Sequence, residues 1–252
     1  MNIIIHFKSL FFGLWVTTAL LLFANNILDV THRFGWGVVF VLTFITFLAI
    51  YQTGRGVVFS IAPIGIILSS LSLLFFIDST FKRSVFAIAV GFLYYMSLLA
   101  IVRMRNNPKD VTARALLSMS IISTVFFYFA AAYGVYINFY IPLWIFVLIN
   151  SVVLFFISFT SFRAYTKRSS LRLILVSILI SFCIAEITWM INFWPFGYLT
   201  DAASVVLFYY VIWDMFVMDF TGNLSKKRVA NNILICLILF LLVIVSSKWV
   251  LI

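Results

Sequence analysis

The chain has 252 residues, of which 65% are apolar and only 10% are charged, and its formal net charge is +10. About a quarter of a soluble domain is charged, so this composition excludes a soluble globular protein and places the chain in a lipid bilayer. The basic residues lie almost wholly in short loops between apolar segments, which is typical of membrane topology and argues against a nucleic-acid-binding face.

Nine apolar segments are long enough to cross a hydrocarbon core of roughly 30 Å. In chain order they are 10–27, 35–51, 57–77, 84–102, 115–137, 141–162, 172–194, 202–220 and 232–251. Backbone in lipid must satisfy its own hydrogen bonds, and these segments are too continuous for alternating barrel strands. We therefore expect an all-α, polytopic integral membrane bundle of about nine transmembrane helices, or eight if the closely spaced second and third segments do not both cross.

The distribution of Lys and Arg predicts the orientation of this bundle. With a cytoplasmic amino terminus, thirteen basic residues lie on the inner side and four on the outer side. We therefore expect a cytoplasmic amino terminus and a bacterial-type inner membrane, with anionic lipid headgroups as further partners of the inner basic loops. The first apolar segment follows Lys8 as in a signal peptide, but no A-x-A-like cleavage site is present, so we expect it to be retained as a span.

No loop is long enough to fold alone, so we expect one transmembrane domain over residues 1–252. Within it, the segment Val90–Tyr95 in the fourth predicted span resembles Val206–Tyr210 in the eighth. This weak similarity suggests a four-plus-four-plus-one organisation of residues 1–110, 111–225 and 226–252.

Two carboxyl groups, Glu186 and Asp214, lie inside neighbouring apolar segments, where an ionisable group costs a few kcal/mol or more. The segment of Glu186 also carries a polar stripe, and Glu186 lies on nearly the opposite face of the helix. The stripe consists of Ser177, Ser181, Thr188 and Asn192. We therefore predict that this helix is packed on both sides.

A third polar residue connects the two carboxyl groups in this hypothesis. Tyr210 lies one turn before Asp214 and, in an antiparallel hairpin, level with Glu186. The sequence thus predicts an intramembrane polar site of Glu186, Tyr210 and Asp214. A proton path and a structural clamp between helices both fit this arrangement, and the sequence leaves the two open.

Further polar and aromatic residues are secondary candidates for the same interior, although packing or an interfacial aromatic belt explains each of them equally well. They are Asn192, Trp189, Trp213, Asn150, Tyr94 and Tyr95. Asp201 and Asp219 lie near the ends of predicted spans, where we expect them to be solvated.

The inventory of catalytic groups is poor. His6 and His32 are the only histidines, and Cys183 and Cys236 have no metal-ligand spacing, so we predict no catalytic residue, metal or cofactor, and the balance is against an enzyme. The leading hypothesis is a small-solute or proton-linked carrier, and the alternative is a non-catalytic membrane subunit or scaffold. An intramembrane enzyme has the least support. The bilayer is an expected partner, and a second copy or another protein remains open.

Overall fold

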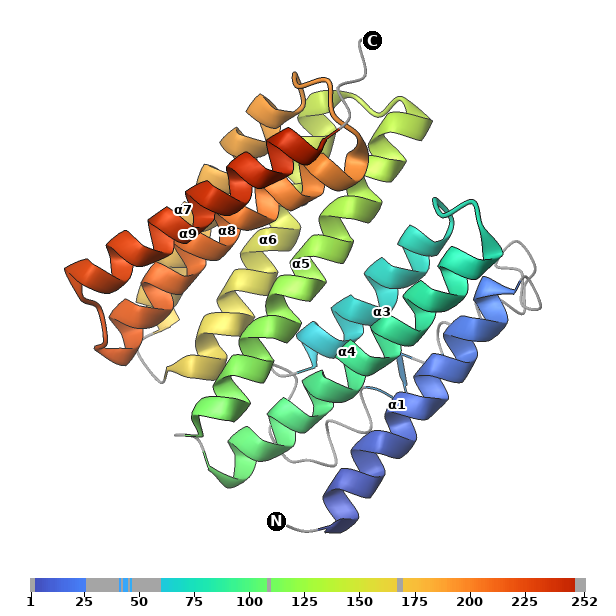
Figure 1. Ribbon diagram of the computed structural model, residues 1–252. Coiled ribbons are helices and arrows are strands. Elements are labelled where there is room, and N and C mark those ends of the chain that lie inside the picture. Colours follow the sequence, from blue (N-terminus) through green and yellow to red (C-terminus); the bar gives the residue numbers. More distant parts are fainter. Residues whose placement is uncertain are drawn as a thin grey trace. The chain divides into compact units, whose positions relative to one another are not determined.

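The computed structural model describes residues 3–25, 41, 43, 44, 46, 60–107, 110–166 and 170–247. This part of the chain contains helices and no strands, so the predicted all-α fold class is confirmed (Figure 1). The helices are α1 (Ile3–Ala24), α3 (Ile61–Leu74), α4 (Thr80–Asn106), α5 (Val111–Phe139), α6 (Leu143–Tyr165), α7 (Ser170–Ile191), α8 (Tyr198–Thr221) and α9 (Lys226–Ser246).

Six of these helices, α4 to α9, are long and apolar enough to cross a membrane, and the protein is an integral membrane protein. The 14 residues of α3 span about 21 Å, less than a hydrocarbon core of about 30 Å. The predicted second span lies outside the described residues, apart from positions 41, 43, 44 and 46. The count of nine spans therefore stays a prediction.

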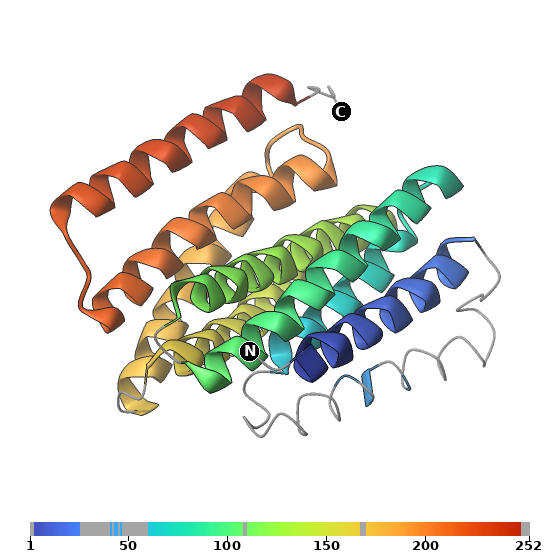
Figure 2. The ribbon, with the colours of Figure 1, turned by 60° about the horizontal axis from the view of Figure 1, so that its bottom comes forward.

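Two compact units divide the chain, unit 1 (Met1–Tyr128) and unit 2 (Phe129–Ile252), and α5 contributes to both. In unit 1, α4 packs against α1 and α3, as Figures 1 and 2 show. The first part of α5 joins α3 through Thr124, whose hydroxyl donates a hydrogen bond of 3.1 Å to the carbonyl oxygen of Ala62. The predicted four-plus-four-plus-one organisation stays a prediction.

The contact between α1 and α4 depends on glycine. A Cβ atom at Gly91 would lie 1.9 Å from Oγ1 of Thr17, and one at Gly13 would lie 3.0 Å from Cβ of Tyr95. Lipid offers no hydrophobic driving force between helices, so close backbone approach over small residues is a main source of stability in membrane bundles. Glycine at position 91 lets the two helices touch there.

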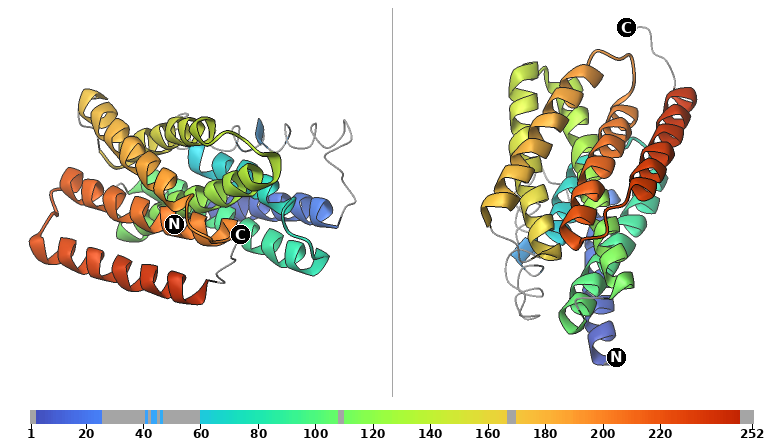
Figure 3. Two further views of the ribbon diagram at one scale, coloured as in Figure 1. Left: turned by 90° about the horizontal axis from the view of Figure 1, so that it is seen from above. Right: turned by 90° about the vertical axis from the view of Figure 1, so that its left-hand side faces the viewer.

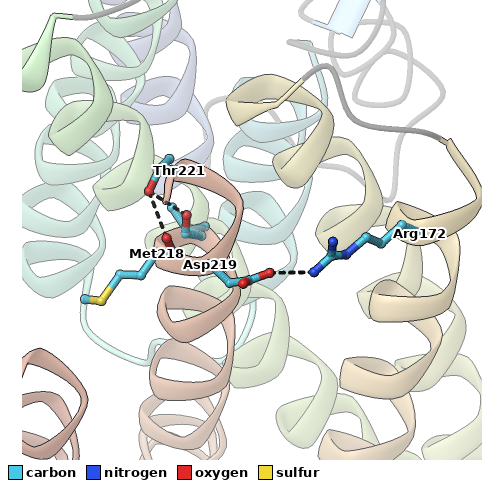
Figure 4. A network of polar contacts seen from close by, with 5 residues as sticks. Arg172, Met218, Asp219 and Thr221 are labelled. Carbon is cyan, nitrogen blue, oxygen red and sulfur yellow. Dashed lines mark hydrogen bonds and ion pairs between the residues drawn. The ribbon is translucent and has the colours of Figure 1, made fainter. Parts of the chain in front are cut away.

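In unit 2, α6 packs against α7, α7 against α8, and α8 against α9, while α6 also contacts α8 (Figure 3). Most side chains of α9 are exposed, and this helix lies at the edge of the unit. At the basic end of the α7–α8 hairpin, Arg172 pairs with Asp219 at 2.9 Å (Figure 4). Both side chains are partly exposed, so this ion pair adds little to the free energy of unfolding. Its main effect is to hold the ends of α7 and α8 side by side.

Gly91→Ala should destabilise the protein, because its new methyl group would collide with Thr17. Overpacking of this kind lowers the free energy of unfolding by about 1–3 kcal/mol. The matched control is Gly197→Ala, because no atom lies within 4 Å of a Cβ atom at Gly197. Thermal unfolding of both variants in detergent tests this, and equal stability would contradict the close α1–α4 contact.

Candidate functional site

The helix α7 has one buried face and one exposed face. The buried residues are Leu173, Ser177, Ile180, Ser181, Ile184, Ala185, Thr188 and Ile191. Glu186 lies on the exposed face and makes no hydrogen bond or ion pair with any residue that the structure describes. The expectation that α7 packs against neighbouring helices on both sides is therefore wrong for the described part of the chain.

Hydrogen bonding explains which face of α7 is packed. The hydroxyl of Ser177 donates to the carbonyl oxygen of Leu173 at 2.7 Å, and that of Thr188 donates to Ile184 at 2.7 Å. The hydroxyl groups of such small side chains form their hydrogen bonds within their own helix, and their small size lets a neighbouring helix approach closely. A carboxyl group cannot form its hydrogen bonds within its own helix in this way. The face of α7 that carries the hydroxyl groups is therefore the packed one, and Glu186 lies on the opposite, exposed face.

Tyr210 and Asp214 lie where α8 faces α9. The amide Nδ2 of Asn232 donates a hydrogen bond of 2.7 Å to Oδ2 of Asp214, and Tyr210 is close enough to Asp214 for electrostatic interaction. One turn further along α9, the thiol of Cys236 donates to the carbonyl oxygen of Leu207 at 3.6 Å. A polar seam thus joins α8 and α9.

The structure brings together two of the three residues of the predicted polar site. Tyr210 and Asp214 are neighbours, whereas within the described part of the chain no hydrogen bond or ion pair joins Glu186 to either of them. Sequence analysis missed Asn232, although its spacing of four residues from Cys236 places both on one helix face. A carboxyl group bonded to an amide across two helices fits the clamp better than the proton path.

A second polar cluster surrounds Tyr133, which is 1% exposed. Its hydroxyl donates to the carbonyl oxygen of Thr188 at 3.4 Å, its ring lies 5.0 Å from that of Phe146, and it interacts electrostatically with Asp201. Asp201 belongs to the first turn of α8 and is only 5% exposed. The expectation that Asp201 is solvated is therefore wrong.

Asn150 on α6 is 1% exposed, and neither its Nδ2 nor its Oδ1 atom has a hydrogen-bond partner among the described residues. The Oδ1 atom of Asp201 is likewise buried without a partner there. A buried polar group without a partner costs about 1–3 kcal/mol, so two such side chains in one unit require an explanation.

The register of α6 and α8 places Asn150 and Asp201 at the same level. The two helices run in the same direction, because α7 reverses the chain between them. The hydroxyl of Ser158 donates to that of Tyr209 at 3.4 Å. Asn150 precedes Ser158 by eight residues (158 − 150), and Asp201 precedes Tyr209 by eight (209 − 201), which is about 12 Å along each helix. The ring of Tyr133 contacts Phe146 on α6, and Tyr133 interacts electrostatically with Asp201 on α8.

The remaining candidates of unit 2 have separate environments. Trp213 is fully buried, and its Nε1 donates to the hydroxyl of Ser161 at 2.8 Å, so it belongs to the α6–α8 core. Trp189 is 45% exposed on α7. Asn192, just after α7, donates from Nδ2 to the hydroxyl of Tyr136 at 3.2 Å, which extends the polar cluster around Tyr133.

Tyr94 and Tyr95 belong to unit 1. Tyr94 is fully buried and donates a hydrogen bond of 3.1 Å to Oγ1 of Thr46, while Tyr95 is half-buried and packs beside Gly13. Like Tyr94, Tyr209 is fully buried with its hydroxyl bonded to that of a neighbouring segment. The duplication that these tyrosine pairs suggest stays a prediction.

Asp201, Asn150 and Tyr133 provide a carboxyl, a carboxamide and a phenol, and each of these side chains is buried in unit 2. These groups can accept a proton or hydrogen-bond a small polar solute, and they contain no nucleophile poised beside a base. Among the residues described, no group of three or more His, Cys, Asp or Glu is placed to hold a metal ion. The chemistry that this arrangement offers is binding.

A comparison with protein families matches residues 55–246 to the family described as Protein of unknown function (DUF5656). The chain belongs to the DUF5656 family. The match spans α3 to α9, so the DUF5656 region contains both the α8–α9 seam and the cluster around Tyr133. No curated protein and no solved structure matches the chain.

Asn232→Ala should weaken the contact between α8 and α9, because it leaves Asp214 without its amide donor. We expect the free energy of unfolding to fall by about 1–2 kcal/mol. The control is Asn231→Ala, which changes an exposed amide one residue away on the same helix. Unfolding in a detergent mixture measures the free energy of unfolding of both variants, and only Asn232→Ala should lower it. An equal decrease in the two variants would contradict the clamp.

The double variant Asp214→Leu with Asn232→Leu should recover stability relative to Asn232→Ala, because replacing both partners leaves no polar group unpaired. A double-mutant cycle with the single leucine variants measures this coupling, which we expect to exceed about 0.5 kcal/mol. Additive losses would show that the two side chains act independently.

Proposed function

We propose that this membrane protein is a small-solute or proton-linked carrier with an interior polar site at Asp201, Asn150 and Tyr133. One observation carries the proposal: Asp201 and Asn150 are buried in unit 2, yet polar atoms of both side chains have no partner among the described residues. Polar groups inside membrane bundles most often mark the pathway of a substrate or an ion.

The unpaired atoms define what the site would bind. Oδ1 of Asp201 accepts a hydrogen bond or a proton, whereas the Asn150 amide offers a donor and an acceptor. A small solute with both donor and acceptor groups would satisfy all three atoms. The carboxyl group would couple its passage to a proton by changing between charged and neutral forms.

In this proposal the predicted trio of Glu186, Tyr210 and Asp214 is divided by role. Asp214 and Tyr210 hold α9 against α8 through Asn232, which supports a clamp. Glu186 lies outside the packed face of α7 and is not a member of the interior site. A bacterial-type inner membrane and anionic lipids at the basic loops remain part of the proposal.

Asp201→Asn should reduce transport at least tenfold while the protein remains folded, since an amide keeps the shape of the side chain but cannot exchange a proton. The measurement uses proteoliposomes that contain a pH-sensitive dye, to which a panel of small polar solutes is added under a pH gradient. Asn150→Leu should cause a similar loss, because it removes the other unpaired groups.

Two matched carboxyl variants serve as controls. Glu186→Gln alters an exposed carboxyl group on α7, and Asp214→Asn alters one that is already hydrogen-bonded, so both should retain solute-dependent proton flux. Equal flux in Asp201→Asn and the wild type would refute the interior site. If no solute produces flux with the folded wild-type protein, the alternative of a non-catalytic membrane subunit is favoured.

A further inference from the structure

Two hydrogen bonds join α5 to the end of α7 in unit 2. The hydroxyl of Tyr133 donates to the carbonyl oxygen of Thr188 at 3.4 Å, and Nδ2 of Asn192 donates to the hydroxyl of Tyr136 at 3.2 Å. Tyr136 follows Tyr133 by three residues (136 − 133), and Asn192 follows Thr188 by four (192 − 188). The Tyr136–Asn192 bond therefore lies about one turn, or about 5 Å, nearer the ends of the two helices.

The Tyr136–Asn192 bond lies at the boundary of the membrane. Asn192 follows Ile191, the last residue of α7, and belongs to the short connection that leads to Tyr198 at the start of α8. A connection between two membrane-spanning helices lies at a membrane surface, because irregular backbone is not stable in hydrocarbon. Tyr133, one turn deeper, is only 1% exposed. The Tyr136–Asn192 bond thus lies between the aqueous surface and Tyr133.

Tyr133 connects this bond to the interior site. It interacts electrostatically with both Tyr136 and Asp201. The rings of Tyr133 and Tyr136 pack on the same side chain of α6, Phe146, at 5.0 and 4.6 Å between ring centroids. Polar side chains therefore follow one another from the membrane surface toward the unpaired carboxyl oxygen of Asp201.

Toward the opposite membrane surface, large side chains fill the space between α6 and α8. Phe162, Tyr209 and Trp213 are fully buried, and the last two form hydrogen bonds with serines of α6. Tyr209 and Trp213 follow Asp201 by eight and twelve residues (209 − 201 and 213 − 201), or about 12 and 18 Å along α8. Several layers of packed aromatic side chains close this direction.

We propose that Tyr136 and Asn192 form a gate through which the interior site of unit 2 opens at the surface that carries the α7–α8 connection. The inference rests on the proposed function for what the site binds. A carrier site opens to one side at a time, so one closure yields while the other holds. The aromatic layers can open only by repacking α6 against α8. The Tyr136–Asn192 bond can open without a change in either helix, because Asn192 lies beyond the end of α7 and water at the surface replaces the bond.

Cysteine labelling tests the side on which the site opens. In a background with Cys183→Ala and Cys236→Ala, Asp201→Cys reports access to the site. Phe193→Cys in the α7–α8 connection and Asn223→Cys in the α8–α9 connection mark the two membrane surfaces. A membrane-impermeant maleimide is added to intact cells and, separately, to inverted membrane vesicles. We expect slow labelling of Asp201→Cys from the surface marked by Phe193→Cys, and labelling from the surface marked by Asn223→Cys would overturn the proposal.

Tyr136→Phe tests the hydrogen bond of the gate. It removes only the hydroxyl group and keeps the ring on Phe146, so it should accelerate the labelling of Asp201→Cys about fivefold, the shift that one hydrogen bond produces in an equilibrium. The control is Tyr140→Phe, which removes a hydroxyl group just beyond the same end of α5 from a side chain that is 92% exposed. Equal labelling rates in the two variants would overturn the gate.

A second reporter keeps the test independent of one substitution. Asn150→Cys introduces a thiol at the other buried side chain of the site, and Tyr136→Phe should accelerate its labelling to a similar degree. Thermal melting in detergent shows whether each cysteine variant is folded. Labelling needs no transported solute, so the gate and the carrier can fail separately. Gated labelling without any flux would support the gate and count against the carrier, whereas solute flux with labelling that Tyr136→Phe leaves unchanged would refute the gate alone.

Discussion

The absence of water inside the bilayer is the constraint on which the remainder of this structure depends. Helices satisfy the backbone, and hydroxyl side chains such as Thr17, Ser177 and Thr188 donate to carbonyl oxygens of their own helix. Carboxyl and carboxamide groups are too polar for this solution. They need partners on other helices, on other molecules or in a bound solute, which is why Asn150, Asp201, Asp214 and Glu186 are the informative residues of unit 2.

These residues differ in how that need is met. Asp214 accepts a hydrogen bond from Asn232 across the α8–α9 contact, which supports a structural role. Asp201 and Asn150 are buried, and polar atoms of both side chains have no partner among the described residues. Glu186 is exposed on the outside of α7. The same physical cost thus supports two different proposals, a clamp at Asp214 and a binding site at Asp201 and Asn150, according to what surrounds each group.

Length and hydropathy were sufficient to predict an all-helical membrane protein and the helices α6 to α9 of unit 2, with ends that differ by up to six residues, as at the start of α9 (226 against the predicted 232). The site was only partly predictable. The spacing of Tyr210 and Asp214 correctly placed both on one face, but no periodicity shows which face of α7 is packed. Asp201 was misjudged because proximity to a turn suggests solvation, whereas the packing of unit 2 buries it and brings it within electrostatic range of Tyr133, 68 positions away in the sequence (201 − 133).

The packed face of α7 takes part in the polar surroundings of Tyr133. The carbonyl oxygen of Thr188 on α7 accepts a hydrogen bond from Tyr133 on α5, and Tyr133 interacts electrostatically with Asp201 on α8. A carrier site opens to alternate sides only if one part of the bundle moves while another stays in place. In a carrier, movement of α5, α7 or α8 relative to the other two would therefore change the surroundings of Tyr133, which links the proposed transport to these three helices.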